Sequence, residues 1–202
     1  PEHFFIVDAG SGSANNLGVA QLPLQRLNAV KNVLAGIVNG VAAAYPQMLR
    51  QGHGHIVITA SMAGLSAAGQ ITSYVATKHA VVGLSLALRT EAVPRGVGVT
   101  VACPATVETP ILDKGAVGGF VGRDYFLQNQ GGRAYDADRL ARDTLRAIER
   151  NKAILVKPAV AHAQWLFARL TPTLMNRLAM RFVAGQRSRQ TLGEASGHPR
   201  SG

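Results

Sequence analysis

The sequence is poor in cysteine, in long apolar runs and in aromatic residues. Its single cysteine, Cys103, has no second cysteine with which to form an internal disulfide, so nothing in the fold requires an oxidising compartment. No apolar run reaches the ~18 residues of a membrane-spanning helix, and the opening PEHFFIVDAG lacks the basic and apolar segments of a signal peptide. These absences predict a cytoplasmic protein without a transmembrane anchor.

Acidic residues are also scarce, and the resulting positive charge is unevenly distributed. The 202 residues include 21 Lys and Arg and 11 Asp and Glu, which gives a net charge of +10. Residues 151–202 contain eight basic residues and one acidic residue, Glu194, so eight minus one, or +7, belongs to this last quarter. With few aromatic residues, such a segment is typical of a solvated surface. Contact with an acidic membrane surface is the alternative, and we expect no nucleic-acid partner.

Short β-branched and apolar runs alternate with helical patterns along the chain. A strand buried on both faces of a parallel sheet needs no strict alternation of polar and apolar residues. The alternation predicts an α/β fold, a partial doubly wound parallel sheet flanked by helices. The predicted strands are residues 3–10, 55–60, 97–103 and, more weakly, 153–156, and the predicted helices are roughly 24–50, 72–93, 137–149 and 159–184.

With 47% hydrophobic residues, the chain can bury the core of a single domain. We expect this domain over residues 1–158, a C-terminal helical extension over 159–185 and a disordered tail over 186–202. Segment 113–135 is glycine-rich and predicts a long irregular loop, which in a compact domain is more often functional than idle. Asp136 or Asp138 is expected to cap the helix that follows.

Three residues in the stretch 58–80 suggest proton-transfer chemistry. Tyr74 and Lys78 are four residues apart on a predicted helix, so their side chains share one face. A nearby ammonium favours the phenolate, and we therefore expect Lys78 to lower the pKa of Tyr74 and make it a usable proton donor and acceptor. Ser61 follows a predicted strand at the edge where open α/β sheets bind ligands, and its hydroxyl could hold a substrate oxygen. The set suits carbonyl reduction or alcohol oxidation.

The order of these residues resembles the short-chain dehydrogenase/reductase family. A serine at a strand end, a Tyr-x-x-x-Lys pair opening the next helix, small residues through VATKHAVVGLS, and a strand ending in CPATVETP all occur in this order. The resemblance implies a Rossmann-like domain, NAD or NADP as cofactor, and a small-molecule alcohol or carbonyl substrate. It assigns catalysis to Ser61, Tyr74 and Lys78, with Lys78 also touching the nicotinamide ribose.

The resemblance also implies cofactor-binding residues. The stretch VDAG is similar to the family's Asn-Asn-Ala-Gly motif, keeping Ala9 and Gly10 and losing both asparagines. The stretch PATVETP is similar to the segment that approaches the nicotinamide, with Pro104, Val107 and Thr109 kept. The family would place the carboxamide of the nicotinamide against the backbone of Val107 and the hydroxyl of Thr109. Tyr74 and Lys78 complete the implied cofactor contacts.

Two features of the family are altered or absent. The asparagine of the proton relay falls on Val33, and Asn32, one position earlier, should point about 100° away. The glycine-rich turn that binds the pyrophosphate is missing, because the glycines of residues 8–18 are followed by Pro23 where a phosphate-binding helix should run. We interpret residues 8–18 as an ordinary strand-to-helix loop. The chain thus resembles the second half of the domain: a truncated form, a chain completed by a partner, or a degenerate relative.

The C-terminal helical pattern mixes apolar and basic residues. It suggests an amphipathic helix pair broken near Pro172, which either packs on the domain and closes the substrate pocket or contacts a membrane surface or a lipid substrate. In the resembled family, the helices corresponding to 24–50 and 72–93 pair between subunits, which implies a homo-oligomer. The apolar and basic residues concerned are Trp165, Leu166, Arg169, Leu170, Leu174, Arg177, Leu178, Arg181 and Phe182.

Two hypotheses of different classes follow. The first is an NAD(P)-dependent oxidoreductase of the short-chain type, in this form or as part of a longer protein. The second is a catalytically inactive relative that serves as a binding or oligomerisation protein. Cys103 is interpreted as a small buried residue and not a nucleophile, and the histidines show no metal-ligand spacing, so no metal site is predicted.

Overall fold

The computed structural model describes residues 4–8, 24–69, 71–113, 116–117, 120–128 and 132–195. Four strands form the central sheet, and a short antiparallel pair lies apart from it. The elements are β1 (Phe4–Asp8), α1 (Leu24–Gln51), β2 (Gly54–Thr59), η1 (Met62–Gly64), α2 (Thr72–Ala92), η2 (Val93–Arg95), β3 (Val97–Pro104), η3 (Pro110–Asp113), β4 (Ala116–Val117), β5 (Phe120–Val121), α3 (Gly122–Gln128), α4 (Ala137–Glu149), β6 (Ile154–Lys157), α5 (Ala159–Leu170) and α6 (Pro172–Ala195).

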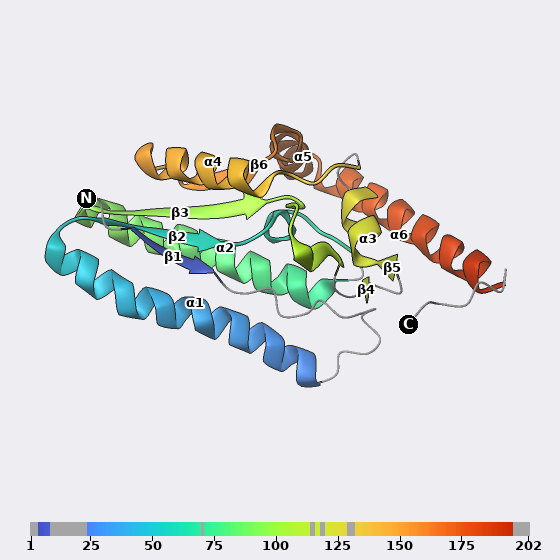
Figure 1. Ribbon diagram of the computed structural model, residues 1–202, viewed down its shortest axis with the longest axis horizontal. Coiled ribbons are helices and arrows are strands. Elements are labelled where there is room, and N and C mark those ends of the chain that lie inside the picture. Colours follow the sequence, from blue (N-terminus) through green and yellow to red (C-terminus); the bar gives the residue numbers. More distant parts are fainter. Residues whose placement is uncertain are drawn as a thin grey trace.

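The central sheet is parallel, in the order β1-β2-β3-β6. Helices α1 and α2 cover one face and α4 and α5 the other, while α3, β4, β5 and α6 lie toward the carboxyl ends of the strands (Figure 1). This arrangement confirms the predicted α/β fold, with a parallel sheet flanked by helices and a C-terminal helical extension. In a sheet of this kind, side chains that follow the strand ends meet at one edge.

The main core lies between the sheet and its helices. Strand β3 is buried over Val97–Cys103, as expected for an inner parallel strand covered on both faces. Ile37 of α1 and Val81 of α2 reach this core from one side, and Ala161 of α5 reaches it from the other. Within the residues that the structure describes, no helix combines the length and apolarity needed to cross a membrane.

Over the part of the chain that the structure describes, the predicted strands and the first three predicted helices agree with it to within a few residues, whereas the last, predicted over 159–184, continues to Ala195. Asp136 is the residue that caps α4, through its side chain and the backbone N–H of Arg139 at 2.7 Å. The predicted break near Pro172 separates α5 from α6.

Two predictions about irregular segments are wrong. Segment 113–135 is not simply a loop, because it contains β4, β5 and α3, and burial of Tyr125 supports this short helix where local sequence does not. The predicted disordered tail over 186–202 is wrong up to Ala195, because α6 continues to that residue.

A buried histidine fixes the spacing between β2 and β3. The Nε2 atom of His55 lies 2.8 Å from Oγ1 of Thr100, and this hydroxyl donates its hydrogen to the carbonyl of Lys152 at 2.6 Å. Since a hydroxyl has one hydrogen, Nε2 of His55 must be the donor to Thr100. The ring lies against Gly98, where an added Cβ would come within 2.2 Å of Nδ1 of His55. Glycine at position 98 is therefore required by the ring of its neighbour.

We expect Gly98→Ala to destabilise the protein by about 1–3 kcal/mol, because the new methyl group overpacks a ring that the bond to Thr100 holds in place. Chemical denaturation measures the free energy of unfolding. The matched control is Gly83→Ala on α2, where an added Cβ meets nothing within 4 Å and the better helix propensity of alanine should stabilise slightly. In a His55→Ala background, Gly98→Ala should cost much less; an equal cost in both backgrounds would refute the role of the ring.

Candidate active site

Ser61 lies just beyond the carboxyl end of β2. It caps the short helix η1, and its Oγ accepts a hydrogen bond from the backbone N–H of Ala63 at 3.2 Å. This bond orients the side chain and leaves the hydroxyl hydrogen for a further partner. Ser61 is half-buried, at the sheet edge where the sequence placed it.

The side chain of Lys78 is buried, with 4% of its surface exposed. Its Nζ donates to the carbonyl oxygen of Thr59, the last residue of β2, at 3.3 Å. The same nitrogen lies 5.6 Å from the centroid of the Tyr74 ring, one helical turn away on α2. Lysine is almost never fully buried without compensating contacts, so this ammonium marks a specialised site. The structure confirms that Tyr74 and Lys78 lie together.

A glycine lets η1 approach α2 beside the lysine. A Cβ at Gly64 would come within 2.5 Å of the carbonyl oxygen of Lys78 and 2.9 Å of Val82. Because the first of these atoms is backbone, it cannot move aside cheaply. Gly64 therefore sets the distance between the segment that carries Ser61 and the helix that carries Tyr74 and Lys78.

Cys103, near the end of β3, is buried in the main core. Burial raises the pKa of its thiol to about 12, with smaller opposing effects from a hydrogen bond to the backbone of Ser61 and from the charge of Lys78. The thiol is therefore protonated at neutral pH, which agrees with its interpretation as a buried structural residue.

Tyr74 packs in an apolar cluster to which α3 and α6 also contribute. Ile71 and Tyr125 are buried, and Tyr74, Phe126 and Phe182 pack against them. The Tyr125 hydroxyl donates to the carbonyl oxygen of Gly69 at 2.5 Å, and burial raises the pKa of Tyr125 to about 12. Helices α3 and α6 thus border the candidate proton donor with apolar surface.

The segment after β3, which the family resemblance assigns to the cofactor, is held from one side by Tyr135. The backbone N–H of Tyr135 donates to the carbonyl oxygen of Thr106 at 2.7 Å, and the carbonyl oxygen of Tyr135 accepts from the backbone N–H of Glu108 at 2.8 Å. Val107 therefore pairs with Tyr135 in a short β-bridge. The Tyr135 hydroxyl in turn donates to the carboxylate of Asp143 at 2.7 Å.

Asp143 is a buried carboxylate on α4 with three polar neighbours. Besides Tyr135, it lies 3.2 Å from Nζ of Lys157 and 3.5 Å from the guanidinium of Arg146. The hydrogen bond from Tyr135, followed by that from Lys157, holds the pKa of Asp143 below its ordinary value. Burial and the bond to Asp143 raise the pKa of Tyr135.

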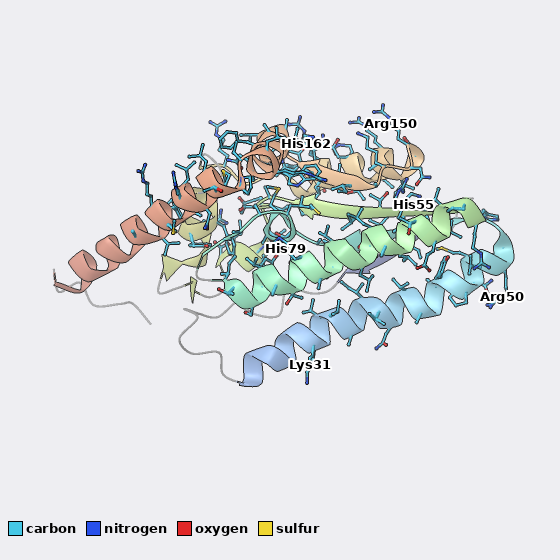
Figure 2. The ribbon with its side chains drawn as sticks, turned by 180° about the vertical axis from the view of Figure 1, so that it is seen from behind. Lys31, Arg50, His55, His79, Arg150 and His162 are labelled. Carbon is cyan, nitrogen blue, oxygen red and sulfur yellow. The ribbon has the colours of Figure 1, made fainter. Side chains whose placement is uncertain are left out.

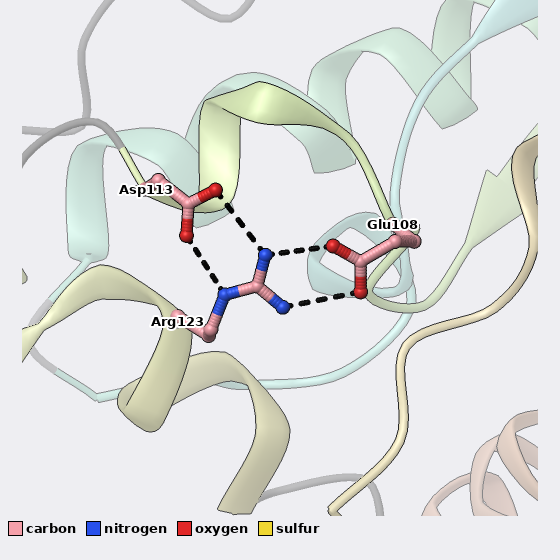
Figure 3. A network of polar contacts seen from close by, with 3 residues as sticks. All are labelled: Glu108, Asp113 and Arg123. Carbon is pink, nitrogen blue, oxygen red and sulfur yellow. Dashed lines mark hydrogen bonds and ion pairs between the residues drawn. The ribbon is translucent and has the colours of Figure 1, made fainter.

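An arginine holds the same segment from the other side. The guanidinium of Arg123 on α3 donates to both carboxylate oxygens of Glu108, at 2.7 and 3.1 Å, and to those of Asp113, at 2.8 and 3.3 Å (Figure 3). These hydrogen bonds lower the pKa of Glu108 and of Asp113 and raise that of Arg123. Both ends of the segment that contains Thr109 are therefore tied to α3.

The structure places most of the predicted cofactor residues. Pro104 ends β3, and Val107 and Thr109 are half-buried in the segment just described. Ala9 and Gly10, with the remainder of the 9–18 loop, lie outside the described residues.

The position of the relay asparagine is occupied as the sequence predicted. Val33 packs against the main core, and Asn32 is exposed on the outside of an uninterrupted α1. Asn32 therefore does not replace the asparagine of the family at the site.

Sequence reasoning missed the side chains that support the cofactor segment. Arg123 lies 15 residues from Glu108 and 10 from Asp113, and Tyr135 lies 8 residues from Asp143. Arginines and carboxylates at such separations in a glycine-rich stretch carry no recognisable spacing. Only the cap "YDAD" at 135–138 offered a local signal, and it pointed to a helix start and not to this network.

Comparison with known families agrees with this geometry. The family described as short chain dehydrogenase matches residues 5–116, which is more than half of the chain. The chain belongs to the short-chain dehydrogenase family. The match includes Ser61, Tyr74 and Lys78 and ends just after the segment that Arg123 holds.

Individual relatives are distant and longer. "Probable oxidoreductase EphD" of Mycobacterium tuberculosis is 28% identical over 184 residues, which are 82% of this chain and 31% of the relative. D-beta-hydroxybutyrate dehydrogenase of Rhizobium meliloti is 33% identical over 107 residues, 50% of this chain and 42% of that enzyme. The chain thus spans about a third of the length of the mycobacterial relative.

Solved structures agree in fold. A short-chain dehydrogenase from Streptomyces avermitilis superposes with a TM-score of 0.68 at 21% identity, covering 89% of this chain and 69% of the other. A protein from Agrobacterium tumefaciens with bound NADP superposes with a TM-score of 0.64 at 22% identity, covering 78% of this chain and 67% of the other. At these identities, the comparison establishes the fold alone.

The lowered pKa of Asp143 predicts acid sensitivity. A carboxylate whose folded pKa is below its unfolded value contributes stability above the unfolded value, near pH 4, and loses it as pH falls through the folded pKa. We expect Asp143→Asn to be less stable than wild type at neutral pH, with the difference shrinking as pH falls toward about 3. Denaturation curves across this range measure it. Glu149→Gln, at an exposed position on the same helix, is the control; a constant difference for Asp143→Asn would contradict the network.

The Cys103 thiol provides a probe of the site that does not need activity. Because it is buried with a pKa raised to about 12, we expect native protein to react with a thiol reagent at mildly alkaline pH far more slowly than unfolded protein. Gly64→Ala should increase this rate by moving η1 and the Ser61 backbone away from the sulfur. Gly83→Ala, on the exposed side of α2, should not; equal rates in both variants would refute the close packing at Gly64.

Proposed function

We propose that the chain is an NAD(P)-dependent oxidoreductase that interconverts an alcohol and a carbonyl compound. The observation that carries the proposal is the buried ammonium of Lys78, 5.6 Å from the ring of Tyr74 at the carboxyl edge of the sheet. Membership of the short-chain dehydrogenase family supports it. Since the chain spans about a third of the mycobacterial relative, the proposal concerns the reaction of this domain.

Three polar residues act on the substrate proton in this proposal. In alcohol oxidation, Tyr74 takes the proton of the substrate hydroxyl, and in carbonyl reduction it returns the proton to the oxygen. A neighbouring ammonium favours the phenolate of a tyrosine, so Lys78 keeps the ring able to exchange that proton near neutral pH. Ser61 donates its free hydroxyl hydrogen to the substrate oxygen and fixes the oxygen near Tyr74.

The residues around the edge fit the nicotinamide end of the cofactor. Lys78 would reach the ribose, and the backbone of Val107 and the hydroxyl of Thr109 would meet the carboxamide, with Pro104 setting the direction of the segment. The bonds from Tyr135 and Arg123 hold this segment in place beforehand. A bound nicotinamide supplies or accepts the hydride. The family resemblance also assigns Ala9 and Gly10, which lie outside the described residues, to the cofactor, which is NAD or NADP.

The apolar surface beside Tyr74 favours a substrate with an apolar group. Ile71, Tyr125, Phe126 and Phe182 offer no charged partner, and they come from the segments that border the proton donor. An apolar substituent next to the reacting alcohol or carbonyl would displace water from these side chains and gain free energy by doing so.

One observation favours the alternative, a catalytically inactive relative with a binding or oligomerising role. The position that the family gives to the relay asparagine is Val33, which packs into the core and cannot pass a proton. Binding of cofactor separates the two functions.

We expect saturable binding of NADH or NADPH below millimolar concentration, within the usual range of substrate and cofactor affinities. Fluorescence titration of the purified chain measures it. The absence of saturation up to millimolar cofactor would rule out catalysis by this chain alone and favour the inactive alternative.

If the cofactor binds, Tyr74→Phe should lower turnover by about 10²–10⁴-fold, the usual contribution of a positioned acid or base, and leave cofactor affinity nearly unchanged. Oxidation of simple secondary alcohols, followed by NADH absorbance, is the assay. The control is Tyr45→Phe, the same change at a half-buried tyrosine of α1 that packs on the main core. Equal turnover in the Tyr74 variant and wild type would remove the assigned proton donor.

A further inference from the structure

The C-terminal helices concentrate the exposed apolar side chains of the structure. Of the eleven large apolar residues that are exposed among the described parts of the chain, seven lie on α5 and α6, and the other four are scattered over α1, η2, η3 and α4. The seven are Val160, Leu166, Phe167, Leu170, Leu174, Leu178 and Met180. Met180 lies about 160° around α6 from Leu178, and we call the other six the outer apolar face.

On α5 this face is one continuous stripe directed away from the core. With 100° between successive residues, Val160, Leu166, Phe167 and Leu170 fall within an arc of about 120°. The opposite side of the helix carries Ala161, which is buried in the main core. Leu170 is 81% exposed. An amphipathic helix on a soluble domain normally turns polar residues outward, so α5 is apolar on both sides.

On α6 an apolar row runs beside a basic row. Leu174 and Leu178 are one turn apart and exposed, and so are Arg177 and Arg181. On α5, Arg169 lies over the ring of Trp165, with its guanidinium carbon 6.0 Å from the ring centroid.

The charged residues of the two helices are mostly basic. Residues 159–195 contain five arginines and one glutamate, Glu194, so five minus one gives +4. Helix α5, marked by His162, lies on the opposite side of the molecule from Lys31 of α1 (Figure 2).

We infer that the outer apolar face docks on the surface of a lipid bilayer that contains anionic lipids. Leu166, Phe167 and Leu170 would enter the boundary between headgroups and acyl chains, and Arg177 and Arg181 would meet lipid phosphates. The exposed apolar side chains match the acyl chains of such a bilayer, and the arginines on the same helices match its anionic headgroups. A second copy of the chain fits less well, because pairing through this face would bring ten arginines together, and residues 159–195 of the two copies contain only two glutamates to offset them.

Docking through α6 would also bring the candidate site to the bilayer. Val183 of α6 lies against Gly69, where an added Cβ would come within 2.3 Å of it, and Phe182 is 6.4 Å from the ring of Tyr125. Tyr125 and Phe182 belong to the apolar cluster in which Tyr74 packs. This consequence rests on the proposed function, whereas docking itself does not.

Co-sedimentation of the full chain with lipid vesicles tests the inference. We expect binding to vesicles of mixed phosphatidylcholine and phosphatidylglycerol that weakens as salt is raised, and affinity at least about tenfold lower for phosphatidylcholine alone. The absence of binding to the mixed vesicles at low salt would overturn the inference and would leave the cofactor titration unaffected.

Two variants address the two components separately. Phe167→Ser/Leu170→Ser removes apolar surface, and Arg177→Gln/Arg181→Gln removes charge; each should lower affinity for the mixed vesicles by about tenfold or more. All four side chains are exposed, so thermal melting should match wild type. Unchanged affinity in either variant would refute that component of the docking.

Matched controls make the same changes elsewhere. Arg133→Gln/Arg142→Gln removes two exposed charges, and Leu145→Ser removes an exposed leucine of α4. Both control variants should retain wild-type affinity for the mixed vesicles. If they lose as much affinity as the test variants, vesicle binding depends on net charge or general hydrophobicity and not on this face, and the inference is wrong. Light scattering adds a further outcome. If Phe167→Ser/Leu170→Ser converts a dimer into a monomer and no form binds vesicles, a second copy covers this face and the inference is wrong.

Discussion

The structure depends on a positive charge held inside the protein at the end of β2. Moving an ammonium out of water costs several kcal/mol even after relaxation, and the carbonyl of Thr59 and the ring of Tyr74 are among the groups that offset this cost for Lys78. Those contacts require α2 to stay in register with β2. The close approach at Gly64 holds η1 against the same stretch of α2. The carboxyl end of β2 and the ring of Tyr74 therefore both contact the ammonium of Lys78.

The main elements could be predicted from sequence because each depends on local or repeating signals. An inner strand such as β3 is an unbroken β-branched run, since both of its faces are covered. Asp136 predicts the start of α4 because its side chain caps the helix. Pro172 predicts the break between α5 and α6 because it lacks a backbone N–H. The pairing of Tyr74 with Lys78 needs only the helical repeat, so it too could be seen in the sequence.

The remaining features depend on contacts that no spacing reveals. Helix α3 is seven residues long, too short to be stable by propensity, and is supported by the buried ring of Tyr125. The bonds from Arg123 to Glu108 and Asp113 cross an irregular stretch whose path is set by tertiary structure. The same is true of Gly98, whose requirement arises from the ring of His55 on the neighbouring strand. The role of such residues can be recognised only when the position of the side chain that they contact is known.

The two supports of the segment after β3 differ in kind. Main-chain bonds to Tyr135 and the buried carboxylate of Asp143 hold its inner part, and salt screens them little. Arg123 holds its outer part through exposed carboxylates, whose ion pairs contribute modestly in water and weaken as ionic strength rises. Since Val107 lies on the inner part, its position follows from the buried support, and the arginine mainly sets where η3 lies against α3. A nicotinamide contact at Val107 would therefore be retained under conditions that loosen the Arg123 bonds.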